Sequence, residues 1–437
     1  MGGAARADDG PERGGASHVA HRRPRLAGRR GRGAAGVSRD GEALRARPLV
    51  RVSTSAARAL REGRAWVYRD EVLEAEAGAA PGQVVRLRSQ RGRDLGCGFF
   101  NPRSQLAVRL LDPDPWARID AAWFRRRLEA AWRYRRERLP EADACRLVFA
   151  EADGLPGLIV DRYGPVVVVG FLAAGLEPFR EAILDQLEEM LAPEAVVERE
   201  EAAIRRREGL PSRSGVLRGR LPEAIRIREG SLRFLVDVLG GQKTGWFLDQ
   251  RENRLRVAAL AAGRRVLDMF THTGGFALQA AAGGAEQVEA WDSSGPALEL
   301  ARANAEENGL GERVRFLEGD AFAVLREKVA SGARYDLVVL DPPAFARRTA
   351  DLDGAYRGYK EINLQAMRLL AAGGLLVSCS CSQPVRAEMF EQMLVDAAAD
   401  AGASFRLLER RGASPDHPVR LGHPASDYLK CFVLERL

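Results

Sequence analysis

After residue 250 the sequence alternates between short apolar runs and longer amphipathic stretches. The apolar runs are RRVLDMF, QVEAWD, VRFLEGD, YDLVVLDPP and LLVSCSCS, and stretches such as GPALELARANAEENG lie between them. Strands separated by helices at this spacing form a mostly parallel sheet, because each helix packs back onto the sheet before the next strand begins. We therefore expect an α/β domain with a Rossmann-like sheet in residues 236–437.

Two smaller domains are expected ahead of this sheet, because a chain of 437 residues is too long for one ordinary core. Residues 48–117 hold short β-like runs, such as LVRVS and GQVVRLRS, separated by turn residues, which predicts a small β-barrel. Residues 118–235 join an amphipathic helix, several strands and the helical stretch EPFREAILDQLEEMLA. This mixture predicts a central α+β domain.

Most of the net positive charge lies at the start of the chain. The net charge is +7, and residues 1–48 carry 11 arginines against five acidic residues, so the remainder is almost neutral. Residues 1–47 are rich in Gly, Ala and Arg and poor in aromatic and β-branched residues, which predicts a disordered tail. Overall charge therefore gives little support for an RNA partner.

Cysteine usage and hydropathy argue against several classes of protein. The five cysteines include no CxxC pair, and no run of about 18 apolar residues could span a membrane. The chain has no P-loop with its lysine, which disfavours a nucleoside triphosphate as ligand. We expect a cytoplasmic protein, monomeric or homodimeric, with free thiols and with neither a membrane anchor nor a metal site.

The turn after the first strand of the repeat is rich in small residues and reads DMFTHTGGF from Asp268 onward. Gly274 and Gly275 allow the backbone to approach a ligand at the start of the next helix, although glycines in such turns can also serve packing alone. Asp268, Phe270 and Thr273 of the same turn are further candidates for cofactor binding.

Acidic residues follow the next two strands as well. Asp292 ends the second strand, and Asp320 ends the third, with Phe322 close behind it. A carboxylate at this place can accept hydrogen bonds from ribose hydroxyls, and Phe322 can contact an adenine ring. One Asp at such a turn is usually a helix cap, but three in series along one edge favour a nucleoside. Without a phosphate cradle, S-adenosylmethionine is the cofactor that fits best.

The fourth strand ends in DPPAF, from Asp341 to Phe345. Pro342 and Pro343 remove backbone donors and stiffen the turn, so Asp341 and Phe345 are expected to face the same edge of the sheet. Such a motif clasps a flipped base in methyltransferases that act on amino groups. Asp341 and Pro342 are candidates for cofactor contact, and Pro343 and Phe345 for substrate contact. A rigid turn without a ligand is the alternative.

The fifth strand ends in SCSCS beside this turn, and Cys381 is the cysteine nearer its tip. C5 of a pyrimidine becomes nucleophilic only after another group adds to C6, and a thiolate can make that addition. Cys381 is therefore the expected nucleophile. Cys379 has the same strand phase and should lie deeper. A buried free cysteine is more often a small apolar residue, so the position of Cys381 beside DPPAF carries the assignment.

Several of these motifs occur together in one known family. TGGFA, DPPAF, the SCS of Ser380–Ser382 and the stretch QKTGWFLDQRENR from Gln242 to Arg254 resemble the bacterial 23S ribosomal RNA cytosine-C5 methyltransferases with an N-terminal PUA domain. The resemblance runs from about residue 48 to the C-terminus and includes DGLPGLIVDRYG, RGYKEIN and DHP.

The resemblance implies a PUA barrel, a class I methyltransferase domain that uses S-adenosylmethionine, and 23S ribosomal RNA as the partner. It implies a cofactor site lined by Gln250, Asp292, Asp320 and Asp341, with Cys381 as nucleophile. The DPPAF turn has no cysteine, which the two-cysteine RNA methyltransferases use for product release, and it has Ala344 where a lysine is common. Asp341 is thus only a candidate for removing the C5 proton.

Two other functions are compatible with the sequence. One is methylation of a purine nitrogen in RNA, for which DPPAF suffices and no thiol is needed. The other is a non-catalytic RNA-binding role of the same fold.

Overall fold

The computed structural model describes residues 47–199 and 202–437. The tail expected in residues 1–47 lies outside these ranges except for Arg47. The described residues form three sheets of five or more strands and one two-stranded hairpin. No helix in these ranges is long and apolar enough to cross a membrane.

The largest sheet has seven strands in the order β16-β15-β14-β17-β18-β20-β19. They are β14 (Arg265–Met269), β15 (Gln287–Asp292), β16 (Val314–Glu318), β17 (Tyr335–Leu340), β18 (Leu370–Ser380), β19 (Phe405–Arg411) and β20 (Lys430–Arg436). Strands β14 to β18 pair in parallel, and β20 and β19 add antiparallel strands at one edge. The expected Rossmann-like α/β class is confirmed. The strand order changes direction at β14, with β15 and β16 on one side of it and β17 and β18 on the other. Folds of this kind bind ligands at such a switch point, here between β14 and β17.

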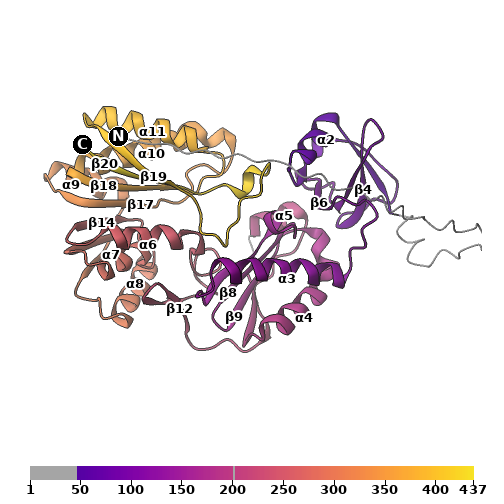
Figure 1. Ribbon diagram of the computed structural model, residues 1–437, viewed down its shortest axis with the longest axis horizontal. Coiled ribbons are helices and arrows are strands. Elements are labelled where there is room, and N and C mark those ends of the chain that lie inside the picture. The colour runs from indigo at the N-terminus through magenta and orange to yellow at the C-terminus, as the bar shows by residue number, and fades with distance from the viewer. Residues whose placement is uncertain (1–46, 200–201) are drawn as a thin grey trace, which may run out of the picture. The chain divides into compact units, whose positions relative to one another are not determined.

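Helices cover both faces of this sheet (Figure 1). One face carries α6 (Arg251–Leu260), α7 (Gly275–Ala282) and α8 (Gly295–Glu307), and the other carries α9 (Ala321–Ala330), α10 (Leu352–Leu369) and α11 (Ala387–Ala401). Their apolar sides form two separate cores, with Phe276 and Leu298 in the first and Ile362 and Phe390 in the second. The sheet is therefore buried on both faces, and ligands can reach it only at its strand ends.

A six-stranded sheet near the N-terminus has its own core, which includes Val50, Leu87 and Phe100. Its elements are β1 (Leu49–Val52), α2 (Thr54–Arg61), β2 (Trp66–Val67), β3 (Val72–Ala75), β4 (Gln83–Ser89), β5 (Asp94–Phe100) and β6 (Val108–Asp112). Gly96 has a φ of 123°, and a Cβ there would lie 2.2 Å from the carbonyl oxygen of Asp112. Only glycine lets β5 pass this close to β6.

The middle of the chain forms a five-stranded sheet with helices and a hairpin. The elements are α3 (Ala121–Arg138), β7 (Ala144–Phe149), β8 (Leu158–Tyr163), β9 (Val166–Phe171), α4 (Arg180–Leu191), β10 (Ala195–Glu198), α5 (Ala202–Glu208), β11 (Gly215–Gly219), β12 (Ile225–Glu229) and β13 (Leu232–Val236). The hairpin of β12 and β13 packs with the seven-stranded sheet, since the Phe234 ring lies 4.5 Å from Trp246 in that core. The boundary expected after residue 235 therefore falls inside β13.

Candidate functional site

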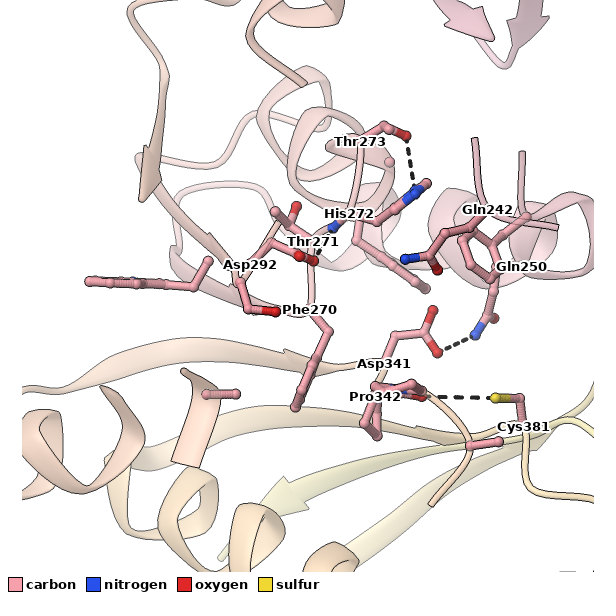
Figure 2. Close-up of a pocket in the computed structure, with 18 of the residues that line it drawn as sticks. Gln242, Gln250, Phe270, Thr271, His272, Thr273, Asp292, Asp341, Pro342 and Cys381 are labelled. Atoms are coloured by element: carbon pink, nitrogen blue, oxygen red, sulfur yellow. Dashed lines mark hydrogen bonds between the residues drawn. The ribbon is translucent and has the colours of Figure 1, made fainter. Parts of the chain in front are cut away.

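A cavity of about 510 Å³ lies at the carboxyl ends of β14, β15, β16 and β17, and the end of β18 reaches its edge (Figure 2). Most of the residues expected to form a site line it. They are Gln250, Phe270, Thr273, Gly275, Asp292, Asp320, Phe322, Asp341, Pro342, Pro343, Phe345 and Cys381. Segments far apart in the sequence meet here because the ends of parallel strands share one edge of the sheet.

Two of the expected cofactor residues, Asp268 and Gly274, do not line this cavity. Asp268 is fully buried at the end of β14, where the Thr271 hydroxyl donates to its Oδ2 at 2.6 Å. Burial raises the pKa of Asp268 to about 7. Gly274 has a φ of 85° and is the N-cap of α7. The Asp268 side chain and the Gly274 backbone both help to form the turn, so neither residue faces the cavity.

The loop between β14 and α7 contains strained backbone. Phe270 and His272 have φ values of 66° and 52°, a region that costs non-glycine residues about 1–3 kcal/mol each. Asp292 holds this loop in place, since its Oδ2 accepts from the His272 amide at 2.8 Å and its Oδ1 accepts from the Ser294 amide at 2.9 Å. The Asp292 carboxylate thus fixes one wall of the cavity as well as lining it (Figure 2).

Asp320 caps α9 and also lines the cavity. Its Oδ1 accepts from the Ala323 amide at 2.9 Å. The ring of Phe345 lies 6.0 Å from Phe322 and 4.6 Å from Tyr359. This aromatic row holds Phe345 in the cavity wall, next to the carboxylates.

Asp341 is held by a short chain of side-chain amides. Gln250 Nε2 donates to Asp341 Oδ1 at 2.8 Å, and Asn253 Nδ2 donates to Gln250 Oε1 at 2.6 Å. Burial, followed by the charge of Asp249, raises the pKa of Asp341 to about 6. A carboxyl group with this pKa can gain or lose a proton near neutral pH.

Cys381 lies at the edge of the cavity, directly after β18. Its Sγ is 3.9 Å from the carbonyl oxygen of Pro342 (Figure 2). Burial, followed by the charge of Asp341, raises the pKa of the thiol to about 11. Cys379 is fully buried and faces Cys431 across the β18–β20 ladder. Of these three cysteines, only Cys381 lines the cavity.

Sequence reasoning missed several residues of the site, most clearly Lys243 and Asp249. Lys243 Nζ donates to Asp249 Oδ2 at 2.6 Å, and the Tyr428 hydroxyl donates to the same oxygen at 2.5 Å. Lys243 also has a φ of 51°. It is one of only four lysines in the chain and lies in the QKTGWFLDQR stretch, which was the available signal. Within the described ranges, no group of three or more His, Cys, Asp or Glu side chains is placed to hold a metal ion.

Known proteins match both the sequence and the fold. A family model described as an S-adenosylmethionine-dependent methyltransferase matches residues 167–433, and a PUA-like domain model matches residues 50–113. Ribosomal RNA large subunit methyltransferase I of Klebsiella pneumoniae subsp. pneumoniae is 39% identical over 371 residues, which cover 84% of this chain and 93% of that protein. The protein of the same name from Escherichia coli O157:H7 is 38% identical and covers 84% and 94%.

A solved structure assigned to a SAM-dependent methyltransferase of Streptococcus mutans has a similar fold. The TM-score is 0.77 at 22% identity, over 89% of this chain and 99% of that one. This likeness concerns the fold alone, whereas the sequence likeness to the bacterial relatives extends over most of the chain.

Proposed function

The chain belongs to the S-adenosylmethionine-dependent methyltransferases, and on that premise we propose that it methylates C5 of a cytosine in 23S ribosomal RNA. The names of its relatives, the PUA-like domain and the thiol beside the cavity support this proposal. We assign residues 48–117 to an RNA-binding barrel, 118–235 to a central domain and 236–437 to the catalytic domain. We also place the enzyme in the cytoplasm, together with its RNA.

The chemistry of the cavity fits the cofactor of this family. Three carboxylates line it, those of Asp292, Asp320 and Asp341, and none of them forms an ion pair within the described residues. The cations that line the same cavity, Lys243 and Arg254, are each paired with another acid. Carboxylates without a cation suit a ligand that carries ribose hydroxyls, an ammonium and a sulfonium but no phosphate. When bound, S-adenosylmethionine supplies an electrophilic methyl group. The residues we assign to it are Gln250, Phe270, Thr273, Gly275, Asp292, Asp320, Phe322, Asp341 and Pro342.

Cys381 supplies the nucleophile in the proposed mechanism. Its thiolate adds to C6 of the cytosine, and the electron pair of the C5–C6 double bond makes C5 nucleophilic, so that C5 takes the methyl group while the electron pair of the broken sulfur–methyl bond stays on the departing thioether. A base then removes the C5 proton, the electron pair re-forms the double bond, and the thiolate leaves C6. Asp341 is our candidate for that base because it lines the same cavity and its pKa is about 6. Pro343 and Phe345 are the proposed contacts to the base.

The position of Cys381 carries this proposal, since its sulfur lies against the DPPAF turn at the edge of the cofactor cavity. The test incubates the protein with unmethylated 23S ribosomal RNA and labelled cofactor, followed by nucleoside analysis. We expect 5-methylcytidine from the wild type. Cys381→Ala should lower its yield by at least about a thousandfold, as loss of a covalent nucleophile does, while calorimetry shows unchanged cofactor binding.

Cys97→Ala is the matched control, because Cys97 is a buried thiol of the barrel, and it should methylate like the wild type. Full activity of Cys381→Ala would remove the covalent mechanism. N-methylated guanosine or adenosine as the product would replace the pyrimidine assignment with the purine alternative. Absence of any heat with S-adenosylmethionine would indicate the non-catalytic role.

A further inference from the structure

A second cavity, of about 460 Å³, adjoins the cofactor cavity. Both cavities are lined by Lys243 and Cys381. The wall of the second cavity combines Trp66 of the N-terminal sheet, Phe149 and Arg199 of the central sheet, and Gln383 and Tyr428 of the catalytic part. All of the residues that we assign to the cofactor line the first cavity and none of them lines the second, so the second one has no role in holding the cofactor.

Phe149 gives the second cavity an aromatic wall. Its ring is partly buried, 5.2 Å from His417 and 6.1 Å from Tyr428. The next residue, Ala150, has a φ of 43°. A left-handed alanine is strained and persists only where surrounding contacts fix it, which is common at binding sites. The aromatic wall is therefore held in place before any ligand arrives.

Arg199 gives this cavity a cation. Its Nη2 donates to the carbonyl oxygens of Gly241 at 2.7 Å and Lys243 at 3.3 Å. These carbonyls orient the guanidinium but leave its charge uncompensated, and within the described residues no carboxylate is ion-paired with it. By contrast, Arg146 in the same wall donates twice to Asp161, at 2.8 Å each. Arg199 is thus the wall cation that can accept an anionic ligand.

Cys381 is accessible from both cavities, and the cofactor occupies one of them. The reacting base lies beside the cofactor, next to Pro343 and Phe345, so the RNA strand attached to it must enter through the other cavity. A nucleotide extruded from RNA brings its ribose and flanking phosphates with it. A stacking ring and an unpaired cation in the wall of one cavity are the usual combination for binding single-stranded RNA.

We propose that the second cavity binds single-stranded RNA at the target nucleotide, with Phe149 stacking on a base and Arg199 contacting a backbone phosphate. This inference rests on the proposed function and adds the route by which the substrate reaches Cys381. Lys243 lies at the junction of the two cavities, held by Asp249, and so marks the boundary between cofactor and RNA.

The test measures the KM for 23S ribosomal RNA transcript and the Kd for S-adenosylmethionine in two variants. Phe149→Leu keeps an apolar side chain but removes the stacking face, and Arg199→Gln removes the charge but keeps a hydrogen-bond donor. We expect each variant to raise the KM for RNA by about tenfold. Arg199→Gln should also flatten the dependence of log RNA affinity on log salt by about 0.7. The Kd for the cofactor should stay at the wild-type value in both variants.

Phe179→Leu and Arg133→Gln are the matched controls, because both residues lie outside the two cavities and Arg133 is exposed. They should behave as the wild type does. Unchanged cofactor binding shows that a variant is folded, so a misfolded Phe149→Leu leaves Arg199→Gln to decide. If both variants keep the wild-type KM and salt slope, the inference is overturned. A wild-type enzyme that modifies another RNA base would instead overturn the proposed function, while the RNA affinities of the variants would still test this cavity.

Discussion

At the scale of single residues, the thiol at the site has surroundings that oppose its ionisation. Burial and then the negative charge of Asp341 raise the pKa of Cys381 to about 11, while Lys243 acts in the opposite direction. Only about one thiol in ten thousand is ionised at pH 7 under these conditions. Ligand binding must therefore lower the pKa of the Cys381 thiol before the thiolate can add to C6. A cationic ligand beside Asp341 would do so by neutralising the charge that opposes the thiolate.

Removing the charge of Asp341 should make the thiol more reactive in the ligand-free protein. Asp341→Asn deletes a negative charge near Cys381, which lowers the pKa of the thiol and raises the thiolate fraction below pH 11. We expect iodoacetamide to alkylate Cys381 about threefold to tenfold faster at pH 8, even though methyl transfer falls. Mass spectrometry of the modified peptide measures the rate.

Asp353→Asn, a change at an exposed position of α10, is the control for this experiment and should alkylate at the wild-type rate. Alkylation of Asp341→Asn at an unchanged or slower rate would mean that Asp341 does not set the ionisation of the thiol.

Residue type and position predicted many of the residues that line the cavity but not all of them. The acids at the ends of β15, β16 and β17 line the cavity, as expected from their places in the sequence. Asp268 looks the same in the sequence, yet it is buried by the turn that Thr271 helps to close. Lys243 was missed because its role depends on Asp249 and on a left-handed backbone, neither of which a sequence pattern displays.

At the scale of elements, the alternating pattern predicted the parallel strands and the edge of the sheet where the site lies. It did not predict β19 and β20, which close the sheet with antiparallel pairing. Partly buried and exposed residues alternate along FRLLERR in β19, which is the period of two typical of a strand. A sequence pattern can show this period, but it does not show which distant strand β19 pairs with. For the same reason residues 225–235, which form most of the hairpin of β12 and β13, were expected in the central domain, although the hairpin packs with the catalytic core.

Asp320 is both the N-cap of α9 and a lining residue of the cofactor cavity, and two substitutions separate these roles. Asparagine is as good an N-cap as aspartate, whereas alanine costs about 1 kcal/mol. Asp320→Asn should therefore keep the melting temperature but weaken cofactor binding about tenfold, because a hydrogen bond to a charged acceptor is lost. Asp320→Ala should lose both stability and affinity. Thermal melts and calorimetry give the two readouts, and wild-type cofactor affinity in Asp320→Asn would show that Asp320 only caps α9.

At the scale of the whole described chain, buried polar contacts join the central sheet to the catalytic part. Arg135 of α3 donates to Asp153 and to the carbonyl oxygen of Asp416, both at 2.8 Å. Arg251 of α6 donates to the carbonyl oxygen of Ala144 at the start of β7. Because buried charged groups are costly to separate from their partners, these contacts keep the two parts at a fixed spacing. The second cavity, whose wall includes both parts, therefore has a defined width without a ligand.

Asp416 of the DHP motif is the centre of this connection and makes its strength dependent on pH. Its Oδ2 accepts from the Arg146 amide at 2.9 Å, and its Oδ1 lies 3.0 Å from His417 Nδ1. Burial alone would raise the pKa of Asp416, but His417, Arg251 and the Arg146 amide outweigh it and hold the pKa at about 2. A depressed carboxyl pKa stabilises the fold above the unfolded value of about 3.9, and this stabilisation is lost as the pH falls toward 2.

Asp416→Asn should consequently lower the free energy of unfolding by about 2 kcal/mol at pH 7. The difference from the wild type should shrink as the pH falls from about 4 toward 2, because the wild-type carboxylate becomes protonated. Urea unfolding at several pH values measures both free energies, and Asp427→Asn, at an exposed position, should show no such difference. A loss of stability that stays constant down to pH 2 would mean that the shape of Asp416, and not its charge, holds the central sheet to the catalytic part.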